Sequence, residues 1–412
     1  MNSRYKAIFA AMIGNALEYY DVLLYGFFAT MLAPLFFPTS DPAVALISSF
    51  GVFAAGFVMR PLGGIVFGHI GDKFGRRQAL ALAIFLVTIP TLTIGLLPTY
   101  ETIGIAAPII LITCRLLQGL CVGGEYAGAA LFAIEHAAKG REAFAGSLLT
   151  ATGFFGGVIG TFFGFICTLP FMPSWGWRIP FLLGSIIGLF GYHLRKQIGE
   201  SPEFLQYKDK AVINVPLFAV LKDGKRNLLC AMGIGVMAVA PFYMASICMG
   251  HVLTSKLHVV TSDVMLITVG LNLAIVVMFP LMGLLADKVG REKLMITTAV
   301  AAMGLAYPLF YMLEVELSVA RVIMVQLALG AMVAGFAAPN VTVMREFFPI
   351  NQRYSGIGFG YALGGALFGG TTPLILATLG GWFHPTIANT GYLIFSGFMG
   401  MAAVIWGKKY KG

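Results

Sequence analysis

The sequence predicts an all-α integral membrane protein in which twelve transmembrane helices form two pseudo-symmetric bundles of six. The first indication is composition: 58% of the 412 residues are hydrophobic and only 11% are charged, whereas soluble domains carry about 25% charged residues. The second is the recurrence of apolar runs of about 20 residues, the length that crosses a hydrocarbon core. The third is a charged loop that occurs twice. The predicted spans cover roughly residues 7–32, 43–67, 78–97, 104–133, 143–168, 179–194, 227–250, 262–285, 294–313, 319–344, 354–379 and 388–407.

The repeated loop divides the chain into two halves. GHIGDKFGRR at residues 68–77 follows the second apolar run, and the similar GLLADKVGREK at 283–293 follows the eighth. One motif at corresponding places predicts two halves with the same topology. We therefore expect an N-terminal six-helix bundle over 1–194, a basic cytoplasmic linker over 195–226 and a C-terminal six-helix bundle over 227–412.

Lysine and arginine set the expected orientation, because the cytoplasmic loops of membrane proteins are enriched in both. Counted from a cytoplasmic N-terminus, the outer loops hold only Arg178, Lys256 and Arg321, and the remaining loop cations fall inside. The sequence therefore predicts that both termini are cytoplasmic. The same asymmetry accounts for the net charge of +9, so we expect no nucleic-acid partner.

The sequence gives no reason to expect a cofactor site or an enzyme active site. The five cysteines fall in or beside the predicted spans without metal-ligand spacing, and the six histidines lie at loops or span ends. The sequence contains no nucleophile arrangement, phosphate-binding loop or nucleotide motif. We therefore expect no metal, no cofactor, and neither an enzyme nor an ATP-driven pump.

The first span carries two carboxylates in an otherwise apolar helix. Glu18 lies roughly 18 Å into this helix at a rise of about 1.5 Å per residue, close to the middle of a bilayer. An ionised side chain at that depth costs about 2.5 kcal/mol or more unless it is paired, protonated or facing a wet cavity. Asp21 follows on the same side of the helix, and Asn15 and Tyr25 extend this polar stripe. We expect this face to take a proton and to help hold a solute.

Arg115 is the expected partner of these acids, because it lies at a similar depth in the fourth span. A nearby guanidinium favours the ionised carboxylate, so an arginine that moves could gate protonation. The alternative is an arginine that only ties two helices together. Glu125, further along the same span, either relays protons inward or pairs with Arg60. Arg60 in turn either grips a substrate carboxylate, for which Arg115 is also a candidate, or forms that structural tie.

A gating latch is expected at the cytoplasmic end of each half. In the first half an ion pair joins Glu135 to Arg76, and Asp72 meets the positive end of a helix dipole. The second half repeats these residue types at the corresponding positions, which are Asp287, Arg291 and Glu346. Breaking either latch should favour opening toward the cytoplasm.

The second half lacks the buried charges of the first. Its first span contains no acid, and Gln326 stands at the position that corresponds to the buried arginine. It offers instead neutral hydrogen-bonding groups, namely Tyr243, Asn272, Asn340 and Tyr361. We expect some of these five side chains to contact the solute from the other side of the cavity, the alternative for each being a bond to a neighbouring helix. Proton coupling is thus expected in the first six helices alone.

Several further motifs resemble one transporter family. They are GNALEYYD at 14–21, RPLGG at 60–64, RLLQG at 115–119, GGEY at 123–126, WGWRIPF at 175–181, ESPEF at 200–204, RYSG at 353–356 and FGG at 368–370. With the repeated loop, they resemble the metabolite:proton symporters of the major facilitator superfamily. The resemblance implies a carrier in a bacterial-type inner membrane, driven by a proton gradient, for solutes such as proline, betaine, citrate, 2-oxoglutarate or shikimate.

We therefore expect a proton-coupled carrier that imports a small carboxylate-bearing solute by alternating access. A proline- or betaine-like zwitterion is favoured, because a di- or tricarboxylate would call for more buried cations than Arg60 and Arg115. An organic-acid:proton symporter is the alternative, followed by a proton-driven exporter and a non-transporting sensor. The glycine-rich stretch 153–160 lacks the Gly-Pro pair of drug/proton antiporters, which weighs against export. The expected partners are the solute, protons and the bilayer, and the expected state is a monomer.

Overall fold

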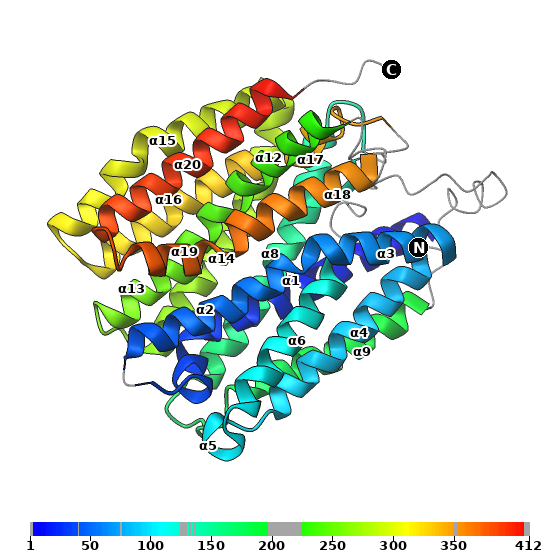
Figure 1. The fold of residues 1–412 in the computed structure, drawn as a ribbon. Coiled ribbons are helices and arrows are strands. Elements are labelled where there is room, and N and C mark those ends of the chain that lie inside the picture. The colour runs from blue at the N-terminus through cyan, green and yellow to red at the C-terminus, as the bar shows by residue number, and fades with distance from the viewer. Residues whose placement is uncertain are drawn as a thin grey trace.

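The chain is helical throughout the part that its computed structural model describes. The described residues are 3–39, 41–74, 76–123, 130–131, 133–134, 137–196, 224–349 and 353–407. Within them, side chains are described except at 3–14, 17, 18, 22, 68, 69, 71–74, 76, 77, 79, 80, 194, 195 and 354. No strand occurs in these ranges, and long helices run nearly parallel to one another (Figure 1).

The first half of the chain folds into helices whose ends follow local sequence signals. They are α1 (Ser3–Phe36), α2 (Pro42–Val58), α3 (Arg60–Phe74), α4 (Arg76–Leu96), α5 (Tyr100–Ile103), α6 (Ala106–Val122), α8 (Glu142–Cys167) and α9 (Arg178–Lys196). At the start of α2, the Asp41 carboxylate accepts a hydrogen bond from the backbone N–H of Ala43, and Pro42 occupies the first helical position. Both features are typical of helix N-termini.

The second half repeats this pattern of long helices. They are α12 (Lys225–Tyr243), η1 (Met244–Cys248), α13 (Met249–Ser255), α14 (Thr261–Val289), α15 (Arg291–Val315), α16 (Val319–Ala337), α17 (Asn340–Met344), α18 (Arg353–Gly364), η2 (Gly365–Gly370), α19 (Thr372–Leu379) and α20 (Pro385–Trp406). The segments η1 and η2 are π-helical, which loosens the regular i→i−4 ladder. Such segments are frequent at functional sites.

Nine helical stretches of the described chain are long and apolar enough to cross a membrane. The shorter helices α4 and α6, together with α9, fall on three further apolar runs of the sequence. The predicted all-helical membrane fold is confirmed, while the count of twelve spans and the cytoplasmic position of both termini stay predictions.

The two halves of the chain pack along each other, and glycines bring several helices into close contact. Helices α8 of the first half and α14 of the second pack side by side where the two halves meet, and α3 packs against α18 (Figure 1). A Cβ on Gly156 of α8 would lie 1.9 Å from the carbonyl oxygen of Ala16 in α1. A Cβ on Gly119 of α6 would lie 1.8 Å from that of Gly56 in α2. Only glycine permits these approaches, which are typical of membrane helices.

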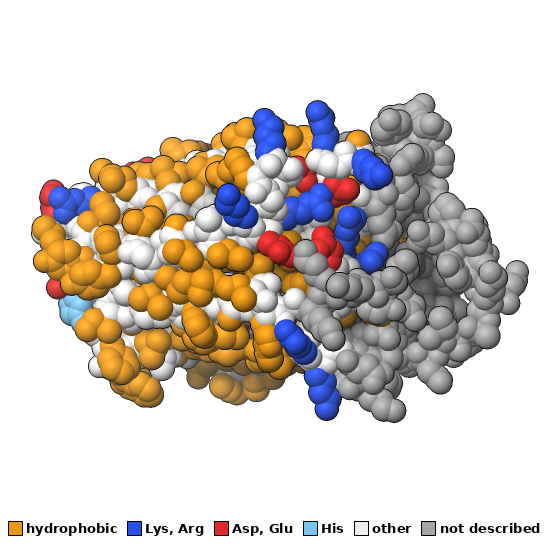
Figure 2. Space-filling model, turned by 90° about the horizontal axis from the view of Figure 1, so that it is seen from above, with side chains coloured by type: hydrophobic (Ala, Val, Ile, Leu, Met, Phe, Trp, Pro, Cys, Tyr) orange, Lys and Arg blue, Asp and Glu red, His pale blue; other side chains and the backbone are white. Residues whose placement is uncertain are grey.

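The outer surface separates apolar from charged side chains. Figure 2 shows hydrophobic side chains over most of the face in view, with lysines, arginines and acids gathered toward one end of that face. Large apolar side chains on the long sides, such as Ile186, Phe190 and Val277, are at least 60% exposed. An exposed apolar belt of this kind suits contact with lipid, where helices satisfy their own backbone hydrogen bonds.

Candidate functional site

A buried carboxylate is the centre of a polar network inside the first half. Asp21 of α1 is only 7% exposed, and both of its oxygens accept hydrogen bonds. The hydroxyl of Thr91, on α4, donates to Oδ1 at 2.7 Å, and the side-chain amide of Gln118, on α6, donates to Oδ2 at 2.9 Å. Gln118 also donates to Thr91 at 2.8 Å. Three helices thus hold one acid in a fixed geometry.

The buried cation joins this network through a glutamine. Arg115 is 2% exposed, and its Nη1 donates to Oε1 of Gln118 at 2.9 Å. The Gln118 amide therefore lies between the guanidinium and Asp21, with its oxygen toward the cation and its nitrogen toward the acid. The guanidinium also lies 4.7 Å from the ring centroid of Tyr25 and 5.7 Å from that of Phe53, within the range of a cation–π contact.

A pocket lies beside this network, where residues from both halves meet. The first half contributes Tyr19, Phe57, Arg60, Val122, Gly123, Thr150 and Phe154, and the second contributes Ala238, Val239, Phe242, Tyr243, Ala337, Gly358, Tyr361, Ala362 and Gly365. Among these described lining residues, Arg60 is the one charged side chain. The pocket therefore presents a cation within a largely apolar and aromatic surface, as solute sites commonly do.

Tyr243 connects the pocket to the buried network. Its ring packs edge-on against Phe57 and Phe53, with centroids 5.5 and 5.4 Å apart. The Arg60 guanidinium lies 3.9 Å above the ring of Phe57. Both Arg60 and Arg115 are close enough to act electrostatically on the Tyr243 hydroxyl. The second half thus places one side chain close to both the buried Arg115 and the half-buried Arg60 of the first half.

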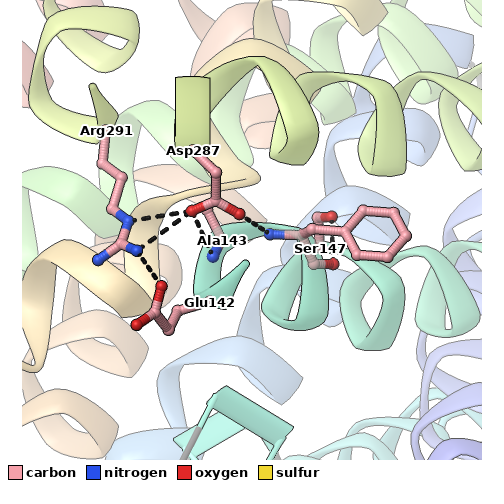
Figure 3. Close-up of polar contacts among 6 residues, drawn as sticks. Glu142, Ala143, Ser147, Asp287 and Arg291 are labelled. Carbon is pink, nitrogen blue, oxygen red and sulfur yellow. Dashed lines mark hydrogen bonds and ion pairs between the residues drawn. The ribbon is translucent and has the colours of Figure 1, made fainter. Parts of the chain in front are cut away.

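A separate cluster of charges holds the two halves together at one end of α14 (Figure 3). Asp287 accepts hydrogen bonds from the backbone N–H groups of Ala143 at 3.1 Å and Phe144 at 2.9 Å, so it caps the N-terminus of α8. Arg291 bonds to Asp287 at 3.1 Å and to Glu142 at 2.5 Å. A carboxylate at a helix N-terminus is favoured by the helix dipole, so this cluster stabilises contact between the halves.

Comparison with known proteins identifies the family. The sugar (and other) transporter family matches residues 6–215. A glycine betaine/proline/ectoine/pipecolic acid transporter of Dickeya dadantii is 34% identical over 91% of this chain and 77% of its own length. The citrate-proton symporter of Klebsiella pneumoniae is 31% identical over 98% of this chain and 92% of its own length. The shikimate transporter of Escherichia coli K12 is 33% identical over 91% of this chain and 87% of its own length. The chain belongs to the metabolite:proton symporters of the major facilitator superfamily.

Solved structures place this symporter in the major facilitator fold. The proton:xylose symporter XylE, bound to 6-bromo-6-deoxy-D-glucose, matches 98% of this chain and 94% of its own with a TM-score of 0.78. Its sequence identity is 18%, so the likeness concerns the fold. A crystal structure of the D-xylose-proton symporter matches with a TM-score of 0.74 over 97% of this chain and 96% of that chain, at 19% identity. The predicted fold is confirmed, and because its relatives are transporters, the symporter is not an enzyme.

The structure describes some of the predicted site residues in the first half of the symporter, whereas others lie outside the described residues. Asn15 of α1 donates to the carbonyl oxygen of Leu149 at 2.9 Å, and the Tyr25 hydroxyl lies 3.4 Å from that of Ser49. The side chain of Glu18 and the whole of Glu125 lie outside the described residues. Their predicted roles in proton coupling stay predictions.

Four of the five predicted polar residues of the second half are buried, and Tyr361 is half-buried. Asn272 is fully buried on α14, close to Gly157 of α8, and its amide atoms have no hydrogen-bond partner in the described part of the chain. Gln326 donates to the carbonyl oxygen of Ala245, in the π-helical segment η1, at 2.9 Å. Asn340 begins α17, where its side chain bonds to the next backbone N–H. Of the five residues, Tyr243 and Tyr361 line the pocket.

The gating residues are only partly described. Asp72 and Arg76 have side chains outside the described set, and Glu135 lies outside it entirely. For the predicted second latch, Arg291 forms ion pairs with Asp287 of α14 and with Glu142 at the start of α8 in the first half, and Glu346 lies half-buried just after α17. The sequence analysis had not singled out Glu142, because nothing in the repeat marks it.

Thr91 and Gln118 were also missed by the sequence analysis. Gln118 stands one helical turn beyond Arg115, so helical spacing places both on one face of α6 and could have identified it. Thr91 gave no comparable signal, because a lone threonine in an apolar helix most often bonds to its own backbone.

In the described part of the chain no cluster of three metal-ligating side chains occurs.

Removing the cap on α8 should loosen the contact between the halves. In Asp287→Asn, the two N–H groups at the start of α8 lose a charged acceptor, an effect of about 1 kcal/mol or more. We expect a roughly fivefold to tenfold rise in the labelling rate of a thiol introduced by Ser147→Cys in a cysteine-free background. Ser147 is fully buried beside Gly283 at this seam.

The matched control for this labelling experiment is Asp263→Asn. Asp263 is exposed in the first turn of the same helix, α14, at the end opposite the cap. Asp263→Asn should therefore leave the labelling rate of the Ser147→Cys thiol unchanged. Equal labelling rates in Asp287→Asn and the parent protein would show that this cluster does not control opening.

Proposed function

We propose that the symporter imports a small carboxylate-bearing solute, preferably a zwitterion, together with protons by alternating access. The observation that carries this proposal is the juxtaposition of a buried acid network around Asp21 with an Arg60-containing pocket to which both halves contribute. A site between two halves is accessible from either side in turn when the halves rock about it. The curated relatives named above transport betaine, citrate and shikimate, and all of these solutes carry a carboxylate.

The network around Asp21 is suited to take up a proton without losing a hydrogen bond. The Thr91 hydroxyl has a second acceptor, the carbonyl oxygen of Val87 at 2.9 Å. When Oδ1 of Asp21 is protonated, the hydroxyl can turn its hydrogen to Val87 and accept the new O–H. Gln118 continues to donate to Oδ2. Since an unsatisfied buried polar group costs about 1–3 kcal/mol, this alternative makes both protonation states of Asp21 accessible.

Solute binding and protonation can influence each other through Arg60 and Arg115. A solute carboxylate bound to Arg60 would change the electrostatic surroundings of Tyr243 and, beyond it, of Arg115. Arg115 acts on Asp21 through Gln118. Carboxyl protonation responds to nearby charge and to water, so a loaded pocket changes the proton affinity of Asp21. The energy source is then the proton gradient, with no other cofactor.

A zwitterion fits the pocket better than a polyanion. Arg60 is the one charged side chain among the described lining residues, so a second or third solute carboxylate would be desolvated without a partner. Such unpaired charges are strongly disfavoured in an apolar site. A solute with one carboxylate and a compensating cationic group avoids this cost.

The uptake assay distinguishes the candidate solute classes. Purified protein in proteoliposomes is given an acid-outside gradient and a panel of betaine, proline, citrate, 2-oxoglutarate and shikimate. We expect gradient-dependent accumulation of betaine or proline. Accumulation of citrate alone would favour an organic-acid symporter, and accumulation under the opposite gradient would favour an exporter. Failure of every carboxylate and zwitterion would refute the proposal.

We further propose that both termini of the symporter face the cytoplasm of a bacterial-type cell and that it works as a monomer of two six-helix bundles. The distribution of lysine and arginine supports this orientation. Helix α1 begins and helix α20 ends at the same end of the molecule (Figure 1). Thiol labelling of cysteines added at the two ends, in intact cells and in inverted vesicles, tests the orientation.

Replacing Thr91 should slow uptake by removing the hydroxyl that adapts to the state of Asp21. In Thr91→Val we expect uptake about tenfold slower, because one oxygen of Asp21 loses its donor at a cost near 1.4 kcal/mol. Thr91→Ser keeps the hydroxyl and should retain most activity. The control is Thr93→Val, since the Thr93 hydroxyl donates to the carbonyl oxygen of Ile89 on its own helix. Equal rates in the Thr91 and Thr93 valine variants would contradict this role.

A further inference from the structure

Aromatic side chains form a continuous wall around the pocket. Six of the described lining residues are aromatic, namely Tyr19, Phe57, Phe154, Phe242, Tyr243 and Tyr361. Phe154 of α8 meets Phe242 of α12 edge-on with centroids 4.8 Å apart, and Phe242 meets Tyr243 at 5.2 Å. Tyr243 then meets Phe57 of α2 at 5.5 Å. The wall therefore crosses from the first half to the second and back.

This wall already accepts a cation. The Arg60 guanidinium lies 3.9 Å above the ring of Phe57, and ring faces attract cations through their quadrupoles, most strongly where water is excluded. Phe57, Phe154, Phe242 and Tyr243 are each at most 5% exposed. A cationic group that enters the pocket therefore meets desolvated ring faces.

The described lining residues include no acid that could pair with a solute cation. A primary ammonium brings three N–H donors, each of which needs an acceptor when it leaves water. A quaternary ammonium has no N–H donor and is attracted by ring faces alone. The wall therefore suits a methylated nitrogen better than a free amine.

We propose that the pocket is an aromatic cage for the quaternary ammonium group of an N-methylated amino-acid zwitterion, whose carboxylate binds Arg60. This inference rests on the proposed uptake of a carboxylate-bearing solute and adds which head group the site selects. Tyr243 comes from the second half, while Phe57 and Phe154 come from the first. The cage is complete only when the halves are together, so a caged solute favours the closed arrangement.

Binding to the purified full-length protein tests the cage independently of transport. Titration calorimetry would compare glycine betaine with 3,3-dimethylbutanoate, which has the same shape but a neutral carbon in place of the nitrogen. We expect betaine to bind at least tenfold more tightly, and affinity to rise from glycine through N,N-dimethylglycine to betaine. Equal affinities for betaine and its neutral isostere, or tighter binding of glycine, would overturn the proposal.

Variants of the wall residues then show which rings are responsible for the selectivity for betaine over its isostere. Tyr243→Leu and Phe57→Leu should lower the ratio of betaine to isostere affinity toward one, and Tyr243→Phe should keep it because the ring face remains. The matched control is Phe36→Leu, a fully buried ring that packs on Trp177 outside the pocket. An unchanged ratio in both pocket variants would overturn the assignment of these rings. If a variant fails to fold, the comparison of the two ligands in the parent protein still decides the proposal.

The outcomes separate this inference from the proposed function. Gradient-driven uptake of a carboxylate without preference for betaine over its isostere would leave the symport proposal standing and remove the cage. Selective betaine binding without gradient-driven uptake would leave the cage standing and remove the symport proposal.

Discussion

Asp21→Asn is expected to reduce the accumulation ratio of solute under an acid-outside gradient to about one. The side chain keeps its size and can still bond to Thr91 and Gln118, but it can no longer exchange a proton. Exchange of labelled for unlabelled solute needs no net proton movement, so it should persist. Accumulation and exchange, measured in the same proteoliposomes, therefore distinguish loss of coupling from loss of binding.

Two further variants help to interpret the result for Asp21→Asn. Asp263→Asn removes an exposed acid at the far end of α14 and should leave accumulation unchanged. Glu18→Gln examines the other acid of the first span, because two interacting carboxyl groups share their titration. Normal accumulation in Asp21→Asn would show that Asp21 has a structural role.

Arg115→Gln is expected to destabilise the protein and to stop transport. The variant leaves the buried Asp21 network without its cation and removes the charged donor to Gln118. Removing one partner from a buried charge network costs about 3 kcal/mol or more. We expect a lower free energy of unfolding in detergent and no accumulation of solute. Arg115→Lys keeps the charge but lacks the planar guanidinium. Its free energy of unfolding and its accumulation of solute should lie between those of Arg115→Gln and of the parent protein.

The double variant Arg115→Gln with Asp21→Asn decides whether these two residues act as one unit. With both charges gone, no uncompensated charge is buried, so stability should return toward that of the parent protein while coupling stays absent. Strictly additive losses of stability would show that Arg115 and Asp21 do not interact across Gln118. The readouts are thermal unfolding for stability and solute exchange for function.

The fold and the approximate depth of the buried charged residues could be predicted from the sequence, because both depend on position along a single helix. Apolar run length and the repeated loop predicted an all-helical major facilitator fold, and the similar depths of Asp21 and Arg115 predicted their proximity. The repeat also drew attention to Asp287 and Arg291, which the structure places together in an ion pair.

What sequence reasoning missed depends on contacts between helices. The bridging place of Gln118 arises only when α1 and α6 pack together, and the ion pair of Glu142 arises only when the start of α8 meets α14. The aromatic wall likewise joins rings from α2, α8 and α12 that are distant in the sequence. With 34 phenylalanines in the chain, no pattern in the sequence distinguishes the few that line the pocket.

The central claim is that solute and proton enter together and that Asp21 carries the proton. It is tested most directly by adding betaine to weakly buffered proteoliposomes with no imposed gradient and recording the external pH. The account predicts that the external medium becomes more alkaline as solute enters, and that this signal is absent in Asp21→Asn while solute exchange persists. Solute entry without proton movement, or an equal alkaline signal in Asp21→Asn, would contradict it.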